Sequence, residues 1–259
     1  HRDPRSMLAQ RLEANAHLIT GSIQEHNCLI GAVNQAHLAV EETVFEPLAA
    51  HFASILPEDR HEGTALVDIG AQSTDLVVYY DESLQLASSL PICGDHFTRD
   101  VALAFHISFE EALAAKEEYG SATAEYTALN SLVEVTAPGD YVSRELPRHV
   151  LNEIIEARAR ELFEHVEREL ARVGMERSLV GGVVLAGGGA RLPGMCDTAE
   201  SVLHCQAGNG LPMGIEDWPQ ELDNPSWTTA AGLAMYSAKL KVQGELERRS
   251  VGVLARILR

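Results

Sequence analysis

An acidic turn between two β-type runs is the first stretch of this sequence that could do chemistry. The residues from Asp68 to Asp75 read DIGAQSTD and lie inside the run ALVDIGAQSTDLVVYY at 65–80. A strand that ends in Asp and Gly places a carboxylate at a sheet edge, where backbone N–H groups can surround phosphate oxygens and the carboxylate can hold Mg²⁺ through water. A plain hairpin with a Gly-containing turn fits the same spacing, and on spacing alone the hairpin is favoured.

Three consecutive glycines form the second candidate. Gly187, Gly188 and Gly189 follow the apolar run VVLA, and glycine lets a backbone approach a flat or anionic ligand closely. A Rossmann fingerprint is the main rival, but Leu192 stands where its third glycine should be, and the acid expected about 20 residues later is missing. The P-loop pattern GxxxxGK[ST] does not occur, which excludes that class of enzyme.

Apolar β-type runs predict the strands that position these motifs, and apolar alternation predicts a strand at 10–20. We expect strands at 10–20, 40–47, 61–70, 74–80 and 84–92, two short strands around Pro138-Gly139, and a buried strand before Gly187.

Capping signals and apolar stripes predict the helices. Ser22 with Glu25 and Ser108 with Glu111 form capping boxes. Further helices are expected from Pro47 to Leu56, from about Thr98, over 147–173, after the glycine turn at 187–189, and from about Thr228. Strands mixed with helices and hairpins predict an α/β domain with a mixed sheet.

Composition limits the classes of function. The chain has 259 residues, 46% apolar and 22% charged, which is ordinary for a globular protein of one or two domains. A net charge of −18 argues against a broad nucleic-acid surface and predicts no nucleic-acid partner. The four cysteines are scattered, as expected of reduced thiols in a cytosol, and no apolar run reaches the roughly 20 residues of a membrane span.

The order of four motifs, EPLA, DIGxxSTD, KEEYG and LAGGGA, resembles the actin-like ATPase superfamily. Within it the chain is most similar to the FtsA family of bacterial division proteins, because RDPRSMLAQRLEANAHLITGS resembles the end of that family's extra subdomain, 1C. The resemblance covers nearly the whole chain. It implies an α/β actin-like ATPase (ribonuclease H-like) fold with a mixed sheet, a complete second lobe and a partial first lobe.

The resemblance also implies a domain organisation. Residues 1–21 would be the end of subdomain 1C, and residues 22–66 would be the remainder of core subdomain 1A. Core subdomain 2A would consist of 67–98 and 175–243, with the inserted subdomain 2B at 99–174 between them. Residues 244–259 would be a basic amphipathic membrane-targeting segment.

ATP and Mg²⁺ are the cofactors that the resemblance implies. Glu46 would orient the attacking water or the magnesium, and Asp68 would be the catalytic acid that holds Mg²⁺ through water. The nucleotide-binding residues would be Gly70, Ala71, Gln72, Ser73 and Thr74 around the phosphates, Lys116 and Glu117 at ribose and adenine, and Gly187, Gly188 and Gly189 at adenosine. The alternative for each is a structural turn or a surface charge.

Two features depart from the family pattern. Ala71 and Gln72 stand where glycines are usual, and a Cβ there costs about 1 kcal/mol or more if the position needs φ > 0 or close contact with phosphate. Asp95 likewise replaces a usual glycine. These changes predict at most a slow Mg-ATPase, with nucleotide binding without hydrolysis as an alternative.

The family's first phosphate loop, a strand followed by Asp-x-Gly, does not occur in these residues. The sequence begins HRDPRSM, and we expect an N-terminally incomplete copy whose ATPase function belongs to the parent protein.

The last twelve residues, RRSVGVLARILR, contain no acid. A basic amphipathic helix lies on anionic lipid with its apolar side down. The expected membrane-contacting residues are Val251, Leu254, Arg256, Ile257, Leu258 and Arg259. The alternative is a frayed helix end with arginines placed by chance.

The region 98–174 resembles the subdomain with which FtsA proteins bind the C-terminal peptide of FtsZ. Arg144 and Arg158 match its SR…II..R pattern and would pair with acidic groups of that peptide. Ordinary ion pairs on a helix surface, each contributing little, are the alternative.

The sequence therefore predicts an FtsA-like adaptor that binds ATP, forms filaments, and tethers FtsZ to the cytoplasmic face of the inner membrane with other division proteins at the division site. A scaffold of the same fold that does not bind nucleotide, and a pilus-assembly actin-like ATPase, stay open as alternatives. A sugar kinase is disfavoured because no substrate lobe with a catalytic Asp is recognisable.

Overall fold

A computed structural model describes residues 8, 10–13, 16, 18–136, 143–175 and 178–257, without the side chains of Thr136 and of residues 243–257. The chain divides into two compact units, His1–Thr43 and Val44–Arg259. Every element of the candidate site lies in the second unit.

The first unit contains one helix, α1 (Ile23–Gln35), among its described residues. The Ser22 Oγ accepts a hydrogen bond from the Glu25 N–H at 3.3 Å, which confirms the predicted start of this helix. The strand predicted at 10–20 is wrong, because its described residues form none. A strand needs a neighbour for its backbone groups, and the described part of this unit offers no paired strand.

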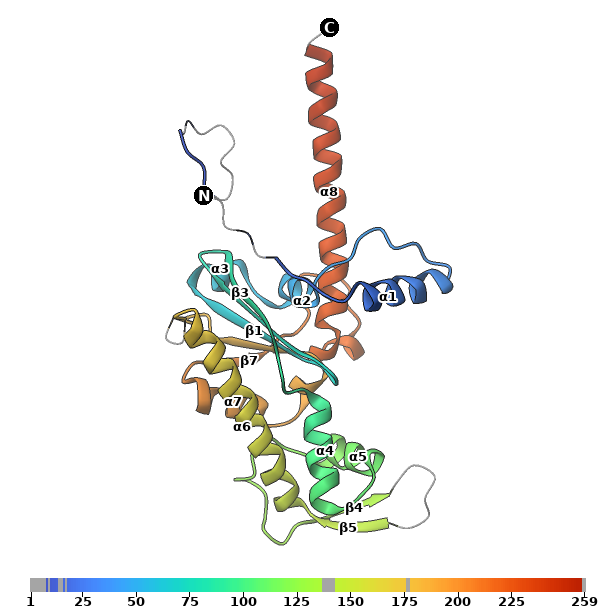
Figure 1. Ribbon diagram of the computed structural model, residues 1–259, viewed down its shortest axis with the longest axis vertical. Coiled ribbons are helices and arrows are strands. Elements are labelled where there is room, and N and C mark those ends of the chain that lie inside the picture. The colour runs from blue at the N-terminus through green and yellow to red at the C-terminus, as the bar shows by residue number, and fades with distance from the viewer. Residues whose placement is uncertain are drawn as a thin grey trace. The chain divides into compact units, whose positions relative to one another are not determined.

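A five-stranded mixed sheet is the centre of the second unit (Figure 1). Its order is β3 (Ser83–Leu90), β2 (Thr74–Tyr80), β1 (Thr64–Ile69), β6 (Val183–Ala186), β7 (Ala207–Asn209). β1 pairs antiparallel with β2 and parallel with β6, so that Asp68 lies opposite both Asp75 and Ala186. The predicted mixed sheet is confirmed, while the three-residue β7 was not predicted from the sequence.

Two helices, α6 (Arg148–Arg172) and α7 (Met195–Leu203), cover one face of the sheet (Figure 1). The helices α4 (Gly94–Phe105) and α5 (Phe109–Tyr119) lie beyond the end of the sheet, where they pack against α6 and extend the same core. Val67 and Ile69 of β1 pack with Leu162 and Phe163 of α6 in this core, and all four side chains are fully buried. The α5 capping box at Ser108 and the long helix predicted over 147–173 are confirmed. α4 begins at Gly94, four residues before its predicted start.

The helices α2 (Glu46–Ser54) and α8 (Thr228–Ile257) cover the opposite face (Figure 1). A Cβ on Gly232 of α8 would lie 1.8 Å from the Ala49 carbonyl oxygen of α2, so these helices are in direct backbone contact. The strand predicted at 40–47 is wrong. Pro47 lies in the first turn of α2, where its missing N–H costs nothing, so it helps to start the helix that was predicted up to Leu56.

The remaining elements are short. They are α3 (Pro57–Glu62), the 3₁₀ helices η1 (Gly188–Arg191), η2 (Gln220–Leu222) and η3 (Pro225–Trp227), and the hairpin of β4 (Leu132–Thr136) with β5 (Ser143–Pro147). The hairpin confirms the two strands predicted around Pro138-Gly139, and that turn itself lies outside the described residues.

Candidate functional site

A cavity of about 590 Å³ opens at the carboxyl ends of β1 and β6. Four segments supply its polar lining: Gly70 and Ala71 after β1, Gly94 and Asp95 at the start of α4, Lys116 and Glu117 on α5, and Gly188, Gly189 and Arg191 after β6. Ile69, Phe97, Leu113, Leu192, Pro193 and Met195 supply the apolar lining. Such a volume is typical of a small-molecule site, and the cavity joins three motifs that are far apart in the sequence.

The turn after β1 is closed by backbone hydrogen bonds. The Gly70 N–H donates to the Ser73 carbonyl at 2.8 Å, and the Asp95 N–H at the start of α4 donates to the Ala71 carbonyl at 2.8 Å. Neither Ala71 nor Gln72 has a positive φ, so neither incurs the backbone cost of a left-handed conformation. The fold accepts their side chains, which are exposed.

The turn after β6 is packed against β1. Gly187 has φ +81°, and a Cβ there would lie 2.4 Å from Asp68 Oδ1. A Cβ on Gly189 would lie 2.3 Å from Ile69 Cγ2. Gly188 differs, because the nearest atom to its Cβ position is Ser226 Oγ at 4.0 Å. The protein's own packing requires two of these glycines, and the third leaves space on the cavity wall.

Asp68 lies at the end of β1 with 5% of its surface exposed. Its Oδ2 accepts a hydrogen bond of 2.9 Å from the hydroxyl of Thr229, the second residue of α8. Burial raises the pKa of Asp68, the Thr229 bond opposes this, and the nearby Asp75 carboxylate raises the pKa further. Asp75 in turn accepts a hydrogen bond of 2.5 Å from Ser89 Oγ.

Glu46, the first residue of α2, is in electrostatic contact with the same two acids. Burial raises the pKa of Glu46, and the Asp68 and Asp75 carboxylates add to the shift. Within the described ranges, no three metal-ligating side chains lie close enough to hold an ion directly. Oxygen donors that are near one another without forming a closed cage fit Mg²⁺ held through water, as the sequence suggests for Asp68.

Lys116 is the half-buried cation of the cavity. Its Nζ donates to Thr98 Oγ1 at 2.8 Å and to the Gly94 carbonyl at 3.3 Å. Burial lowers the pKa of Lys116, and the neighbouring Glu117 and Asp95 carboxylates oppose that shift. A second cation, Arg191, lines the cavity as well and was not predicted. The position of Arg191, two residues after the last of the three glycines, could have identified it from the sequence.

Some predicted residues lie off the cavity lining. Gln72 and Ser73 are exposed in the turn, whereas Thr74 is fully buried and its Oγ1 has no hydrogen-bond partner in the described structure. Glu46 and Asp68 belong to the α2–α8 side of the sheet. A ligand in the cavity would therefore have to extend past the end of β1 to reach these acids.

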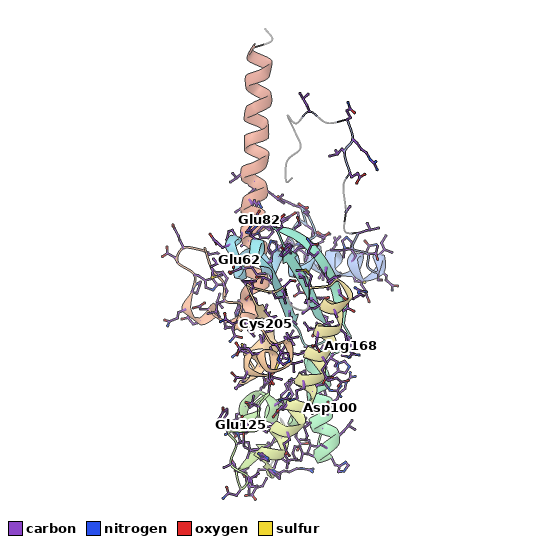
Figure 2. The ribbon with its side chains drawn as sticks, turned by 90° about the vertical axis from the view of Figure 1, so that its left-hand side faces the viewer. Glu62, Glu82, Asp100, Glu125, Arg168 and Cys205 are labelled. Carbon is purple, nitrogen blue, oxygen red and sulfur yellow. The ribbon has the colours of Figure 1, made fainter. Side chains whose placement is uncertain are left out.

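The two predicted partner-binding arginines have acidic neighbours of their own. Arg144 Nε lies 3.5 Å from Glu111 Oε1. Arg158 on α6 binds both carboxylate oxygens of Asp100, at 2.5 and 2.9 Å, and also Glu161 at 2.6 Å. Asp100 projects from α4 beside α6 (Figure 2). A peptide acid that binds Arg158 would compete with these carboxylates.

The predicted membrane segment is described only as backbone. α8 continues to Ile257, and the side chains of Val251, Leu254, Arg256 and Ile257 lie outside the described set, as do Leu258 and Arg259 entirely. None of the helices over the described residues is both long and apolar enough to cross a bilayer.

Solved structures with the same fold include actin-like proteins. MreB5 of Spiroplasma citri bound to ADP superposes with a TM-score of 0.68 at 14% identity, over 87% of this chain and 68% of that one, and its form bound to AMPPNP has a TM-score of 0.66. A PilM–PilN type IV pilus biogenesis complex gives 0.61 at 21% identity, over 82% of this chain and 58% of that one. These likenesses show that the fold is that of the actin-like ATPases, as the sequence predicted.

Sequence relatives are more specific. "Cell division protein FtsA" of Pseudomonas aeruginosa is 31% identical over 94% of this chain, and that of Borreliella burgdorferi is 33% identical over 96%. The chain spans 58% and 60% of the length of these two relatives. The family model described as "Cell division protein FtsA" matches residues 65–232, which include the acidic turn, the α5 lysine and the triple glycine. The chain belongs to the FtsA family of cell-division proteins.

Proposed function

We propose that this chain binds ATP with Mg²⁺ across the end of β1 and acts as a nucleotide-dependent adaptor of cell division. The main support is the single cavity shared by the turn after β1, the turn after β6 and the Lys116–Glu117 pair of α5. The same fold holds ADP and AMPPNP in the MreB5 structures.

The cavity lining suggests how the nucleotide would lie. Adenine and ribose would occupy the cavity between Lys116 and Glu117 on one side and Gly188 and Gly189 on the other. The phosphates would extend along the turn formed by Gly70, Ala71, Gln72, Ser73 and Thr74 toward the α2–α8 side of the sheet. The exposed side chains of Ala71 and Gln72 are compatible with this path because they do not strain the turn.

The carboxylates would act at the phosphate end. Mg²⁺ would neutralise phosphate charge there, held through water by Asp68. Glu46 would orient the attacking water, and its raised pKa brings it closer to the range in which a carboxylate accepts a proton effectively. We propose slow turnover at most, with nucleotide binding as the main contribution.

Membership of the family and the sequence patterns support the adaptor role. We propose the subdomain boundaries given by the resemblance, with 99–174 binding the FtsZ C-terminal peptide through Arg144 and Arg158. The basic segment 244–259 would contact anionic lipid on the cytoplasmic face of the inner membrane at the division site. Head-to-tail filaments would add avidity to this single short contact, and other division proteins would join the assembly.

A scaffold that binds no nucleotide is the second candidate. The backbone N–H of Asp95 already donates to the Ala71 carbonyl, so this donor at the start of α4 is not free for phosphate. The absence of positive φ at Ala71 and Gln72 removes the other argument for this candidate, which was backbone strain.

Titration of the complete protein with a fluorescent ATP analogue, with Mg²⁺ or with EDTA, separates the two candidates. We expect saturable binding that is tighter with Mg²⁺. Lys116→Met should weaken it, whereas Lys241→Met, the same change at an exposed position of α8, should not. Absence of binding by the unmodified protein under both conditions would favour the scaffold.

A further inference from the structure

The hydrogen bond between Thr229 and Asp68 joins two segments that are 161 residues apart in the sequence. Asp68 ends the central strand β1, and Thr229 lies in the first turn of α8. The Thr229 hydroxyl donates to Asp68 Oδ2 at 2.9 Å. A buried carboxylate oxygen without a donor is unfavourable, so the Thr229 hydroxyl stabilises this orientation of the group.

The other carboxylate oxygen is confined by the turn after β6. The Cβ position of Gly187 lies only 2.4 Å from Asp68 Oδ1, which leaves no room for a side chain there. The Asp68 carboxylate is therefore held between a donor at Oδ2 and a glycine backbone at Oδ1. Rotation about its terminal torsion, which is otherwise broad, is restricted from both sides.

The start of α8 is itself firmly attached to the sheet. The fully buried Thr228 donates its hydroxyl to the Gly210 carbonyl after β7, and the Gly187 N–H donates to the Pro225 carbonyl at 3.0 Å. Further along, Gly232 brings α8 into backbone contact with α2, the helix that begins at Glu46. The Thr229 hydroxyl is thus presented to Asp68 from a rigid frame.

We propose that Thr229 is a positioning residue that orients the Asp68 carboxylate toward the magnesium ion of a bound nucleotide. The Thr229 bond fixes the plane of the carboxylate, and the acceptor sites that it leaves on the two oxygens can receive a hydrogen bond from a magnesium-bound water. Groups that orient a metal-binding carboxylate typically change metal affinity about 10–100-fold when they are removed. This inference rests on the proposed function, because it requires that the site binds Mg-nucleotide.

The test compares Thr229→Val with Thr229→Ser in the complete protein. Valine has nearly the same shape without the donor, and serine keeps the donor without the methyl group. The affinity for a fluorescent ATP analogue is measured with Mg²⁺ and with EDTA. We expect Thr229→Val to weaken binding about tenfold with Mg²⁺ and to leave binding in EDTA unchanged, while Thr229→Ser stays close to the unmodified protein.

Two results would overturn the inference. One is equal Mg-dependent affinity for Thr229→Val and the unmodified protein. The other is an equal loss with Mg²⁺ and with EDTA, which would indicate a packing role alone. If valine prevents folding, Thr229→Ala tests the same point, with the unfolding transition as the check. Failure of the proposed function is distinguishable, because the unmodified protein itself would then bind no nucleotide.

Discussion

Two turns border the cavity at the carboxyl ends of the parallel strands β1 and β6, and they use glycine differently. In the turn after β6, Gly187 adopts φ +81° and lies against Asp68, while Gly189 lies against Ile69. In the turn after β1, Ala71 and Gln72 are exposed and have ordinary negative φ values. The first of these turns depends on glycine for its packing, and the middle of the other does not.

The difference shows what a glycine motif reports. Two of the three glycines after β6 are required by contacts with the neighbouring strand, whether or not a ligand binds. Gly188, whose Cβ position has no neighbour closer than 4.0 Å, is the one that the fold does not need. A glycine-rich pattern therefore combines folding and binding requirements, and single substitutions can separate the two.

Gly187→Ala should have the largest effect. The new Cβ would have to exist at φ +81° and would lie 2.4 Å from Asp68 Oδ1 and 2.5 Å from the Ile69 carbonyl oxygen. The left-handed backbone alone costs about 1–2 kcal/mol, and the clash adds to it. We expect the free energy of unfolding, measured by chemical denaturation, to fall by at least about 2 kcal/mol. A change near zero in the free energy of unfolding would mean that the turn after β6 tolerates side chains as well as the turn after β1 does.

Asp68→Asn tests the carboxylate that both turns surround. We expect the Mg-dependent part of ATP affinity to fall by at least about tenfold, because the neutral amide cannot replace the charge that holds a magnesium-bound water. Titration with and without Mg²⁺ measures this. Retained Mg-dependent affinity would exclude Asp68 as the magnesium-holding group.

The same variant has a predicted signature in stability. The folded-state pKa of Asp68 is raised above its ordinary value of 3.8, so the unfolded chain loses this proton first as the pH rises. The free energy of unfolding should therefore fall as the pH rises from about that value through the folded-state pKa. Asp68→Asn should reduce this loss and leave the protein at least as stable at neutral pH, as denaturation across pH would show. A greater loss in the variant would contradict the direction of the pKa shift.

The comparison also shows which features the sequence could predict. β1 and β2 follow from short apolar runs, and the Ser108 cap and α6 from residues three or four apart, so local patterns are sufficient for them. The sequence predicts the helix after Pro47 but not that the residues before it form no strand, because proline both ends strands and starts helices, and the contact of α2 with α8 is distant in sequence.

The arrangement of the site depended on contacts that no local pattern contains. The cavity unites segments from β1 to η1, and the Thr229–Asp68 bond spans 161 residues. The φ values of Ala71 and Gln72 could not be predicted either, because the hydrogen bond of the Asp95 N–H to the Ala71 carbonyl helps to set the turn. The sequence motifs predict most of the segments that line the cavity, but which side chains face it depends on the tertiary structure.

Gly188→Ala separates binding from folding and serves as the matched control for Gly187→Ala. With no protein atom closer than 4.0 Å to the new Cβ, the free energy of unfolding should change by less than about 0.5 kcal/mol. If the nucleotide lies against this backbone, affinity for the ATP analogue should still fall several-fold. If affinity and stability are both unchanged, the adenosine does not lie against the turn after β6.

The double substitution Ala71→Gly with Gln72→Gly should have the smallest effect, and it tests the other turn. Because neither residue has a positive φ, glycine relieves no strain and only adds freedom to the unfolded chain, which costs about 0.4–1 kcal/mol for each substitution. We expect a correspondingly small loss of stability in chemical denaturation, and ATP-analogue affinity within a few-fold of the unmodified protein. A tenfold gain in affinity would instead show that the two side chains obstruct the phosphates. The turn after β1 would then need glycine to bind the ligand, whereas the turn after β6 needs glycine to fold.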